Sequence, residues 1–230
     1  MKAYVYGQER ELGPEFSEYF SPQGVAVLSI DMHRGHLDEG PDCPCPAPRA
    51  RELVAPINAF HQKVRTLGIP IVHVKSVLRP NGEDDVNGIP AAWRLTFPLH
   101  VGPIPNAAEH ALEGSRWTEW VTEVLPQDMR VENKRRLSAF YPTDLDFLLR
   151  NRRINTIVLN GGFTDCCVLN TAFDANNHNY RVIVLRDLTR GTDEHLEAAA
   201  LAMVSLHLGV VTDARELLRI WGLNWGLGSK

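Results

Sequence analysis

Two adjacent cysteines lie in the run GGFTDCCVLNTAF (161–173), where a helix is expected to begin. The two glycines before them let the chain turn sharply. At the start of a helix the backbone N–H groups are unpaired and the dipole favours negative charge, so a thiol there ionises more readily and becomes a nucleophile. The same N–H groups can stabilise an oxyanion. The alternative is a pair of buried thiols in a core helix, since free cysteine is often buried.

Two charged residues could complete a catalytic site with such a thiol. Asp31 directly follows the apolar run GVAVLSI, and Lys134 lies in the segment NKRRLSAF. A carboxylate in an apolar pocket can take the proton of a thiol, and a lysine beside both groups stabilises charge. Alone, the aspartate could be a turn residue and the lysine a solvated charge. Together with a cysteine they would suit the hydrolysis of an amide.

The elements that must position these residues alternate between strand and helix. Short β-branched apolar runs indicate buried strands, and apolar residues at helical spacing, such as those from Leu53 to Leu67, indicate helices. We expect strands at 24–31, 69–78, 129–132, 154–162, 180–187 and from 210, and helices at 48–67, within 115–124, at 143–152, 164–178, 193–209 and before 221.

This alternation predicts a single-domain α/β fold, a doubly wound (Rossmann-like) six-stranded parallel sheet with helices on both faces, over residues 25–221. Residues 1–24 are expected to form an irregular lead-in. Residues 79–125 break the rhythm with many turn residues and are expected to be an insertion or lid with little regular structure. Residues 222–230 are expected to be a flexible tail.

The predicted sheet brings the three candidate residues together. Ligands bind such sheets outside the carboxyl ends of the strands. Asp31 ends the first strand, Lys134 lies just past the third, and the cysteines lie just past the fourth. All three should therefore share one edge of the sheet.

Composition narrows the class of protein. The chain has 230 residues, 44% hydrophobic and 23% charged, with a formal net charge of −4, which disfavours nucleic acid as a partner. No signal peptide and no membrane-spanning stretch are expected. The four cysteines form two close pairs in sequence rather than a disulfide framework. Free thiols in a reducing cytoplasm are the expected state.

Three blocks of sequence, in order, resemble those of the isochorismatase-like cysteine hydrolases, which include nicotinamidases, carbamoylsarcosine amidases, and ureidoacrylate and biuret-type amidohydrolases. The blocks are VLSIDMHRGHLD, NKRRLSAFYPTDLDFLLRNRRINTIVLNG and GGFTDCCVLNTAFDA. The resemblance implies that Asp31 is the base, Lys134 the charge stabiliser and Cys167 the nucleophile. Cys167 takes this role because it directly precedes Val168, as in the family, which leaves Cys166 as a packing thiol.

The resemblance also implies a mechanism. A cis peptide would join Gly162 to Phe163, and the N–H groups of Phe163 and Cys167 would form the oxyanion hole. The thiolate would attack a small amide, ureido or carbamoyl compound, ammonia or an amine would leave, and water would hydrolyse the thioester. A catalytically idle member that binds a small metabolite or a protein partner is the alternative.

Residues that could line a small polar pocket are His33, Trp93, Arg94, Arg136 and Phe140. No cofactor is expected. Nicotinamidases hold a metal through an Asp-x-His segment after the second strand, and the corresponding VHVKSVLRPNGEDD lacks it.

A second metal hypothesis rests on His33, His36, Cys43 and Cys45, which are all possible zinc ligands. Their spacing matches no standard finger, so we expect no metal, a pair of pocket histidines and a surface loop.

The aromatic residues near both ends bear on assembly. The lead-in contains five of them, and Trp221 and Trp225 lie at the other end. Aromatic side chains are enriched at interfaces. Either the two ends fold over their own domain, or the chain forms a homodimer or homotetramer. The resemblance favours the oligomer, with the insertion or a terminus near a neighbour's active site.

Overall fold

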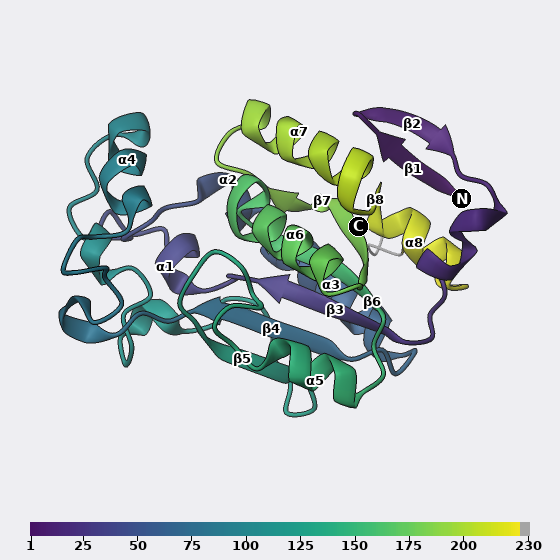
Figure 1. Cartoon of the computed structure of the whole chain (residues 1–230), viewed down its shortest axis with the longest axis horizontal. Helices are drawn as coiled ribbons and strands as arrows, with labels where there is room; N and C mark the ends of the chain where they lie inside the picture. The colour runs from purple at the N-terminus through teal and green to yellow at the C-terminus, as the bar shows by residue number, and fades with distance from the viewer. Residues whose placement is uncertain (226–230) are drawn as a thin grey trace.

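Six parallel strands form the central sheet in the computed structural model of the chain, which describes residues 1–225 (Figure 1). Their order across the sheet is β5-β4-β3-β6-β7-β8. The strands are β3 (Val25–Ile30), β4 (Ile71–Ser76), β5 (Met129–Lys134), β6 (Thr156–Gly162), β7 (Arg181–Arg190) and β8 (Val210–Thr212).

Helices cover both faces of this sheet, which confirms the predicted doubly wound α/β class. Side chains of α3 and α8 share one apolar core with the sheet, and side chains of α5 and α6 share the other. The helices are α1 (Arg34–Leu37), α2 (Pro48–Arg51), α3 (Val54–Arg65), α4 (Ala92–Val101), α5 (Leu145–Asn151), α6 (Leu169–Asn177), α7 (Glu194–Met203) and α8 (Ala214–Ile220).

The strand order reverses between β3 and β6. β3 pairs with β4 on one side and with β6 on the other, so the chain leaves these central strands in opposite directions. In open α/β sheets the crevice at such a reversal, beyond the carboxyl ends of the strands, is where ligands bind. Every residue of β3 and β6 is buried, as expected for strands covered on both faces.

The N-terminal segment is a β-hairpin rather than the irregular lead-in that we expected. β1 (Lys2–Val5) pairs antiparallel with β2 (Gln8–Glu11). Tyr6 and Gly7 both have positive φ, 50° and 75°, the combination that suits a two-residue hairpin turn. All four residues of β2 are exposed, so the sequence gives no apolar alternation there.

The described residues near both ends of the chain pack on their own domain. The Tyr4 hydroxyl donates to Asp213 at 2.8 Å, and the Trp221 indole donates to the carbonyl of Phe20 at 2.9 Å. Leu223 and Trp225 contact the same apolar core as α8, so the described part of the expected flexible tail is packed. Residues 226–230 lie outside the described residues.

The insertion contains a regular helix that we did not predict. α4 spans ten residues of it, with Pro98 inside and no buried side chain. Figure 1 shows α4 at the end of the molecule opposite the β1–β2 hairpin. The helix expected within 115–124 is a single 3₁₀ turn, Arg116–Thr118.

Three predicted helices differ in detail from those observed. The predicted helix 48–67 is divided into α2 and α3. The predicted helix 164–178 begins with a π-helical turn, Thr164–Val168, before α6, and the predicted helix 193–209 ends with another, Val204–Leu208, after α7. Within residues 1–225, no helix combines the length and the apolar character needed to cross a membrane.

Candidate active site

Asp31 lies at the carboxyl end of β3, and the side chain is almost completely buried. Its φ of 52° is in the left-handed region, which aspartate tolerates better than most residues and which is enriched at functional sites. One carboxylate oxygen, Oδ1, accepts a hydrogen bond from the backbone N–H of Ser76 at 2.7 Å, and the other, Oδ2, accepts from Lys134 Nζ at 2.7 Å. The carboxylate is therefore held by one donor from β4 and one from β5.

Lys134 ends β5, and only 1% of the residue is exposed. The parallel register pairs Ser76 with Lys134, which brings the carboxyl ends of β4 and β5 level with each other. Besides Asp31, Nζ donates to Ser76 Oγ at 2.7 Å and to Cys167 Sγ at 3.3 Å. These three contacts use every N–H donor of the ammonium.

Cys167 lies in the π-helical turn between β6 and α6 and is 6% exposed. The neighbouring Cys166 is only partly buried, and the two sulfur atoms lie 3.9 Å apart. Lys134 contacts Cys167 Sγ directly, so the structure distinguishes the two thiols by geometry.

The turn that carries Cys167 follows a close approach of two strands. Gly161 has a φ of 107°, and a Cβ there would lie 2.2 Å from the carbonyl oxygen of Ile30. Only glycine fits this position, which lies immediately beside the end of β3. The next peptide bond, between Gly162 and Phe163, is cis, and so is the bond between Tyr141 and Pro142.

Asp31, Lys134 and Cys167, called the trio from here on, influence one another's pKa values. Burial alone would raise the pKa of Asp31, but the Lys134 ammonium outweighs it, and the pKa lies below its ordinary value. Burial alone would lower the pKa of Lys134, but the Asp31 carboxylate raises it above its ordinary value. The contact with Cys166, together with burial, raises the pKa of the Cys167 thiol, which Lys134 partly opposes. At neutral pH the site therefore holds a carboxylate, an ammonium and a neutral thiol.

A cavity of about 890 Å³ opens beside the trio. Lys134, Cys166, Cys167 and Phe163 lie on its sheet side. Its other walls include apolar and polar residues of the insertion: Trp93, Arg94, Phe97, His100, Glu109 and His110. The insertion therefore forms part of the cavity that the cysteine faces.

Of the five predicted pocket residues, Trp93, Arg94 and Arg136 line this cavity. His33 and Phe140 do not. His33 is completely buried beneath the cavity wall, with Nε2 3.9 Å from Asp31 Oδ1. The Phe140 ring stacks on His178 instead, so the residue packs in the apolar core that α5 and α6 share with the sheet.

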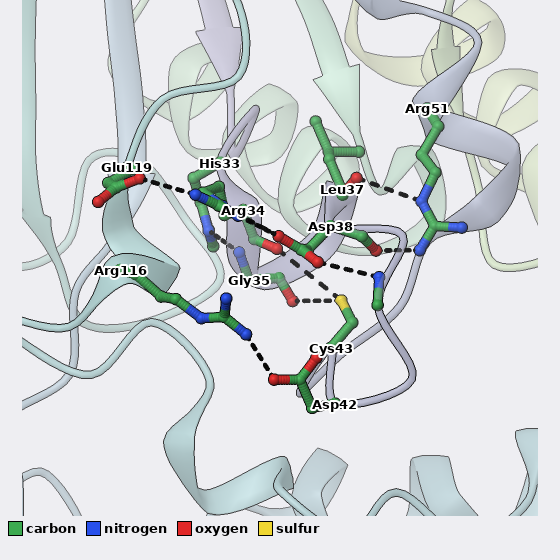
Figure 2. A network of polar contacts seen from close by, with 11 residues as sticks. His33, Arg34, Gly35, Leu37, Asp38, Asp42, Cys43, Arg51, Arg116 and Glu119 are labelled. Carbon is green, nitrogen blue, oxygen red and sulfur yellow. Dashed lines mark hydrogen bonds and ion pairs between the residues drawn. The ribbon is translucent and has the colours of Figure 1, made fainter.

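The four residues of the alternative metal hypothesis, His33, His36, Cys43 and Cys45, do not form a set, and both cysteines are buried rather than on the surface loop that we expected. Cys43 Sγ turns to the backbone carbonyls of Arg34 and Gly35, at 3.8 and 3.5 Å (Figure 2). The two histidines do lie together, and a third, His110 of the insertion, joins them.

Two residues at the site were missed by sequence reasoning. Ser76 binds both Asp31 and Lys134, and its place at the end of the second predicted strand was the available signal. His110 is far from His36 in sequence, and the segment around His110 contains no pattern that indicates a contact with His36.

Comparisons with known proteins bear on the family of this chain. The family model described as the isochorismatase domain matches residues 25–216. Maleamate amidohydrolase of Pseudomonas putida is 30% identical over 199 residues, 84% of this chain and 86% of that protein. N-carbamoylsarcosine amidase of an Arthrobacter species is 24% identical over 163 residues, and the match spans 70% of this chain but only 58% of that protein.

Solved structures support the fold. A crystal structure of a cysteine hydrolase from Pseudomonas syringae pv. phaseolicola superposes with a TM-score of 0.75 at 22% identity, covering 87% of this chain and 93% of that one. The amidase and amidohydrolase relatives support a hydrolase of carbon–nitrogen bonds other than peptide bonds. Because the domain model covers most of its length, the chain belongs to the isochorismatase family.

Proposed function

We propose that the chain is a cysteine-dependent amidohydrolase that cleaves a C–N bond of a small amide, ureido or carbamoyl compound. The observation that carries this proposal is the position of Lys134, whose ammonium contacts both the Asp31 carboxylate and Cys167 Sγ inside a buried site. A base, a nucleophile and a charge stabiliser are the groups that acyl transfer through a thioester requires. The cavity beside Cys167 offers room for a small substrate.

The first half-reaction forms the thioester. Asp31 takes the proton of the Cys167 thiol, and Lys134 stabilises the thiolate. Sγ then attacks the carbonyl carbon, and the backbone N–H groups of Phe163 and Cys167 hold the resulting oxyanion. When the tetrahedral intermediate collapses, the C–N bond breaks and Asp31 returns its proton to the nitrogen, so that ammonia or an amine leaves.

The second half-reaction regenerates the enzyme. Asp31 accepts a proton from water as the water oxygen attacks the thioester carbonyl. The C–S bond then breaks, the carboxylic or carbamic acid leaves, and the proton returns to the Cys167 sulfur. No oxidant, reductant or further reactant enters this sequence.

The cavity favours a substrate that carries a negative charge besides its amide. Arg94 forms an ion pair with Asp85, and Arg79 lies 3.6 Å from Asp84. Arg136 instead donates to the backbone carbonyls of Arg135 and Asp84, and within residues 1–225 no carboxylate pairs with it. A guanidinium that lines the cavity without an acidic partner is suited to bind a substrate carboxylate.

A catalytically idle protein that binds a metabolite through the same cavity is the second candidate. It would leave the buried Asp31–Lys134 pair without a chemical role, although taking two charges out of water is costly. We therefore prefer the enzyme.

The test is a screen for ammonia release over ureido, carbamoyl and carboxamide compounds, including maleamate and N-carbamoylsarcosine, with Cys167→Ala as the blank. For each compound that is consumed, the reaction is quenched in acid, and the protein is analysed by mass spectrometry, first intact and then as peptides. An acyl adduct that maps to the peptide containing Cys167 supports the thioester. Binding of the same compounds without turnover would favour the idle protein.

The proposal extends to assembly and compartment. Leu95, Leu99 and Val101 of α4 are exposed, with 85% of Leu99 accessible, beside the cavity wall that α4 forms. Exposed apolar surface of this kind often marks a contact site, so we propose a homodimer or homotetramer in which the insertion meets a neighbour. Light scattering of the wild type and of Leu99→Glu tests this, and a wild-type mass of one chain contradicts it. The four free cysteines fit a reducing cytoplasm.

A further inference from the structure

Three histidines converge at the wall of the cavity, and the proposed reaction uses none of them. His33 and His36 flank the start of α1, and His110 follows the 3₁₀ turn Ala107–Glu109 of the insertion. All three are buried, and one ring nitrogen from each lies within 4.8 Å of the others. The shortest of these separations, between Nε2 of His36 and Nε2 of His110, is 3.1 Å.

In the rings of His33 and His36, hydrogen bonds determine which nitrogen carries the proton and which presents a lone pair. His36 Nδ1 lies 3.0 Å from the carbonyl oxygen of Cys45, so Nδ1 carries the proton and Nε2 presents a lone pair. His33 Nδ1 lies 2.9 Å from the carbonyl oxygen of Trp117 and 3.2 Å from the N–H of Gly35. The shorter contact places a proton on Nδ1, which leaves His33 Nε2 as a second bare lone pair. A ring N–H donated to a backbone carbonyl is the usual support of a metal-binding histidine.

Within residues 1–225, two ring nitrogens of this histidine cluster lack a hydrogen-bond partner. His33 Nε2 and His110 Nδ1 are buried and accept or donate no hydrogen bond within the described residues. Buried polar atoms in native proteins are nearly always satisfied, so each exception requires an explanation. A cation that accepts the lone pairs of three imidazoles would satisfy His33 Nε2 and would remove the need for His36 and His110 to share one proton.

The rings are also in the right charge state. Burial lowers the pKa of His33 to about 3, and it lowers the pKa of His36 and of His110. Neutral imidazole is the form that binds metals. A bound dication would lie close to the carboxylate of Asp31, because Asp31 Oδ1 is 3.9 Å from His33 Nε2. The negative charge of this carboxylate would offset part of the positive charge of the dication.

We propose that His33, His36 and His110 form a three-histidine site for a divalent transition metal ion such as Zn²⁺. In a tetrahedral zinc site with Zn–N bonds of about 2.0–2.1 Å, the ligand nitrogens lie about 3.3–3.4 Å apart. The separation of 3.1 Å between His36 and His110 matches this, and His33 has to move only a short way. His36 and His110 line the cavity, so the fourth coordination position is open to water or to a small ligand there.

The surrounding structure holds the two segments in place. Arg34 donates to Asp38 within the α1 segment and to Glu119 of the insertion, at 3.0 and 3.1 Å (Figure 2). Arg116 of the insertion pairs with Asp42 in the same figure. These ion pairs keep the segment of His33 and His36 beside the insertion that carries His110. The site is distinct from the Asp-x-His segment of nicotinamidases, since none of its three histidines lies in VHVKSVLRPNGEDD (72–85).

The test measures metal directly and is independent of the proposed function. Untagged protein is stripped with a chelator, loaded with Zn²⁺, desalted and analysed for retained zinc. We expect one zinc ion per chain in the wild type, and affinity reduced at least ~100-fold in His36→Gln and His110→Gln. His61→Gln is the matched control, because His61 is an equally buried histidine that contacts Asn160 on a different element and should leave zinc binding unchanged.

Co²⁺ provides a second measurement that needs no variant. Wild-type protein should give the intense visible absorption of tetrahedral cobalt, and Zn²⁺ should displace it and raise Tm, since a ligand that binds only the folded state stabilises it. If the wild type retains no more zinc than His36→Gln, or if Co²⁺ keeps the pale spectrum of the hydrated ion, the proposal is wrong.

Discussion

Lys134 Nζ lies 3.3 Å from Cys167 Sγ, although Lys134 ends β5, Cys167 lies in the turn after β6, and the two residues are 33 positions apart. Both residues are almost completely buried, and the same ammonium also holds the Asp31 carboxylate. In a low-dielectric site such contacts are stronger than in water, and each partner depends on the others. Substitutions at these positions should therefore affect both activity and stability, and the two effects can be separated.

The first prediction distinguishes the two thiols. Cys167→Ser should lower the rate of ammonia release at least ~100-fold, because a hydroxyl at the same place is a far poorer nucleophile than a thiolate. Cys166→Ser is the matched control and should keep most of the activity, since Cys166 lies beside the cavity but receives no hydrogen bond from Lys134. Initial rates of both variants check this, and the reverse order would show that the nucleophile is Cys166.

The second prediction concerns the buried ion pair. Asp31→Asn removes the base, which should cost at least ~100-fold in rate. It also leaves the Lys134 ammonium buried without its counter-charge, which should cost about 3–5 kcal/mol of unfolding free energy. The double variant Asp31→Asn with Lys134→Met should regain part of this stability without regaining activity. Urea unfolding of the wild type, the single variant and the double variant measures the effect, and equal stability of the single and double variants would contradict it.

Ser76 provides the third prediction, at a position that sequence reasoning did not single out. Ser76→Ala removes a hydrogen bond to a buried ammonium and should cost about 1.5–3 kcal/mol of stability, while the backbone N–H that binds Asp31 remains. Ser29→Ala is the control, because Ser29 is also a buried strand serine but its hydroxyl has no partner within the described residues. Equal losses for the two variants in urea unfolding would argue against the contact between Ser76 and Lys134.

The parts of the fold that sequence predicted have a common physical origin. Strands buried on both faces are continuous apolar runs, so β3 and β6 and the residues that follow them were located correctly. β2 was missed because all its residues are exposed, and α4 was missed because it buries no side chain and contains Pro98. Neither element has the periodicity from which a strand or helix is predicted.

Contacts across the insertion could not be predicted for a different reason. His110 meets His36 only because the chain from β4 to β5 folds back over the edge of the sheet. Nothing in the local sequence specifies that path. The same limit explains Phe140, which follows Lys134 closely in sequence but packs with Tyr180 in the apolar core that α5 and α6 share with the sheet.

The fourth prediction follows from the buried histidines. Burial lowers the pKa of His33 to about 3 and lowers that of His36 and His110 as well. An unfolded histidine has a pKa near 6.5. As the pH falls below this value the unfolded chain binds protons that the folded chain does not, so the stability present above pH ~6.5 is lost at about 1.4 kcal/mol per pH unit for each histidine.

Urea unfolding of metal-free protein between neutral and mildly acidic pH checks this sign. Asp31 and Lys134 do not contribute in that window, since the pKa of the first is lowered and that of the second is raised. His110→Gln should reduce the slope by about one proton. A slope that is unaffected by His110→Gln would show that this ring is not buried in its neutral form.

The last prediction concerns the negative end of the substrate. Arg136 lines the cavity and donates only to backbone carbonyls within the described residues, so its charge is available to a ligand. Arg136→Gln should raise KM at least ~10-fold for an anionic amide, the low end for a hydrogen bond to a charged group, with little change in kcat. For a neutral amide of similar size KM should stay the same, because no charge is lost from that complex. Arg150→Gln is the control, since Arg150 pairs with Asp146 on the surface of α5, away from the cavity. If Arg136→Gln raised KM equally for neutral and anionic amides, Arg136 would shape the cavity rather than bind the substrate's charge.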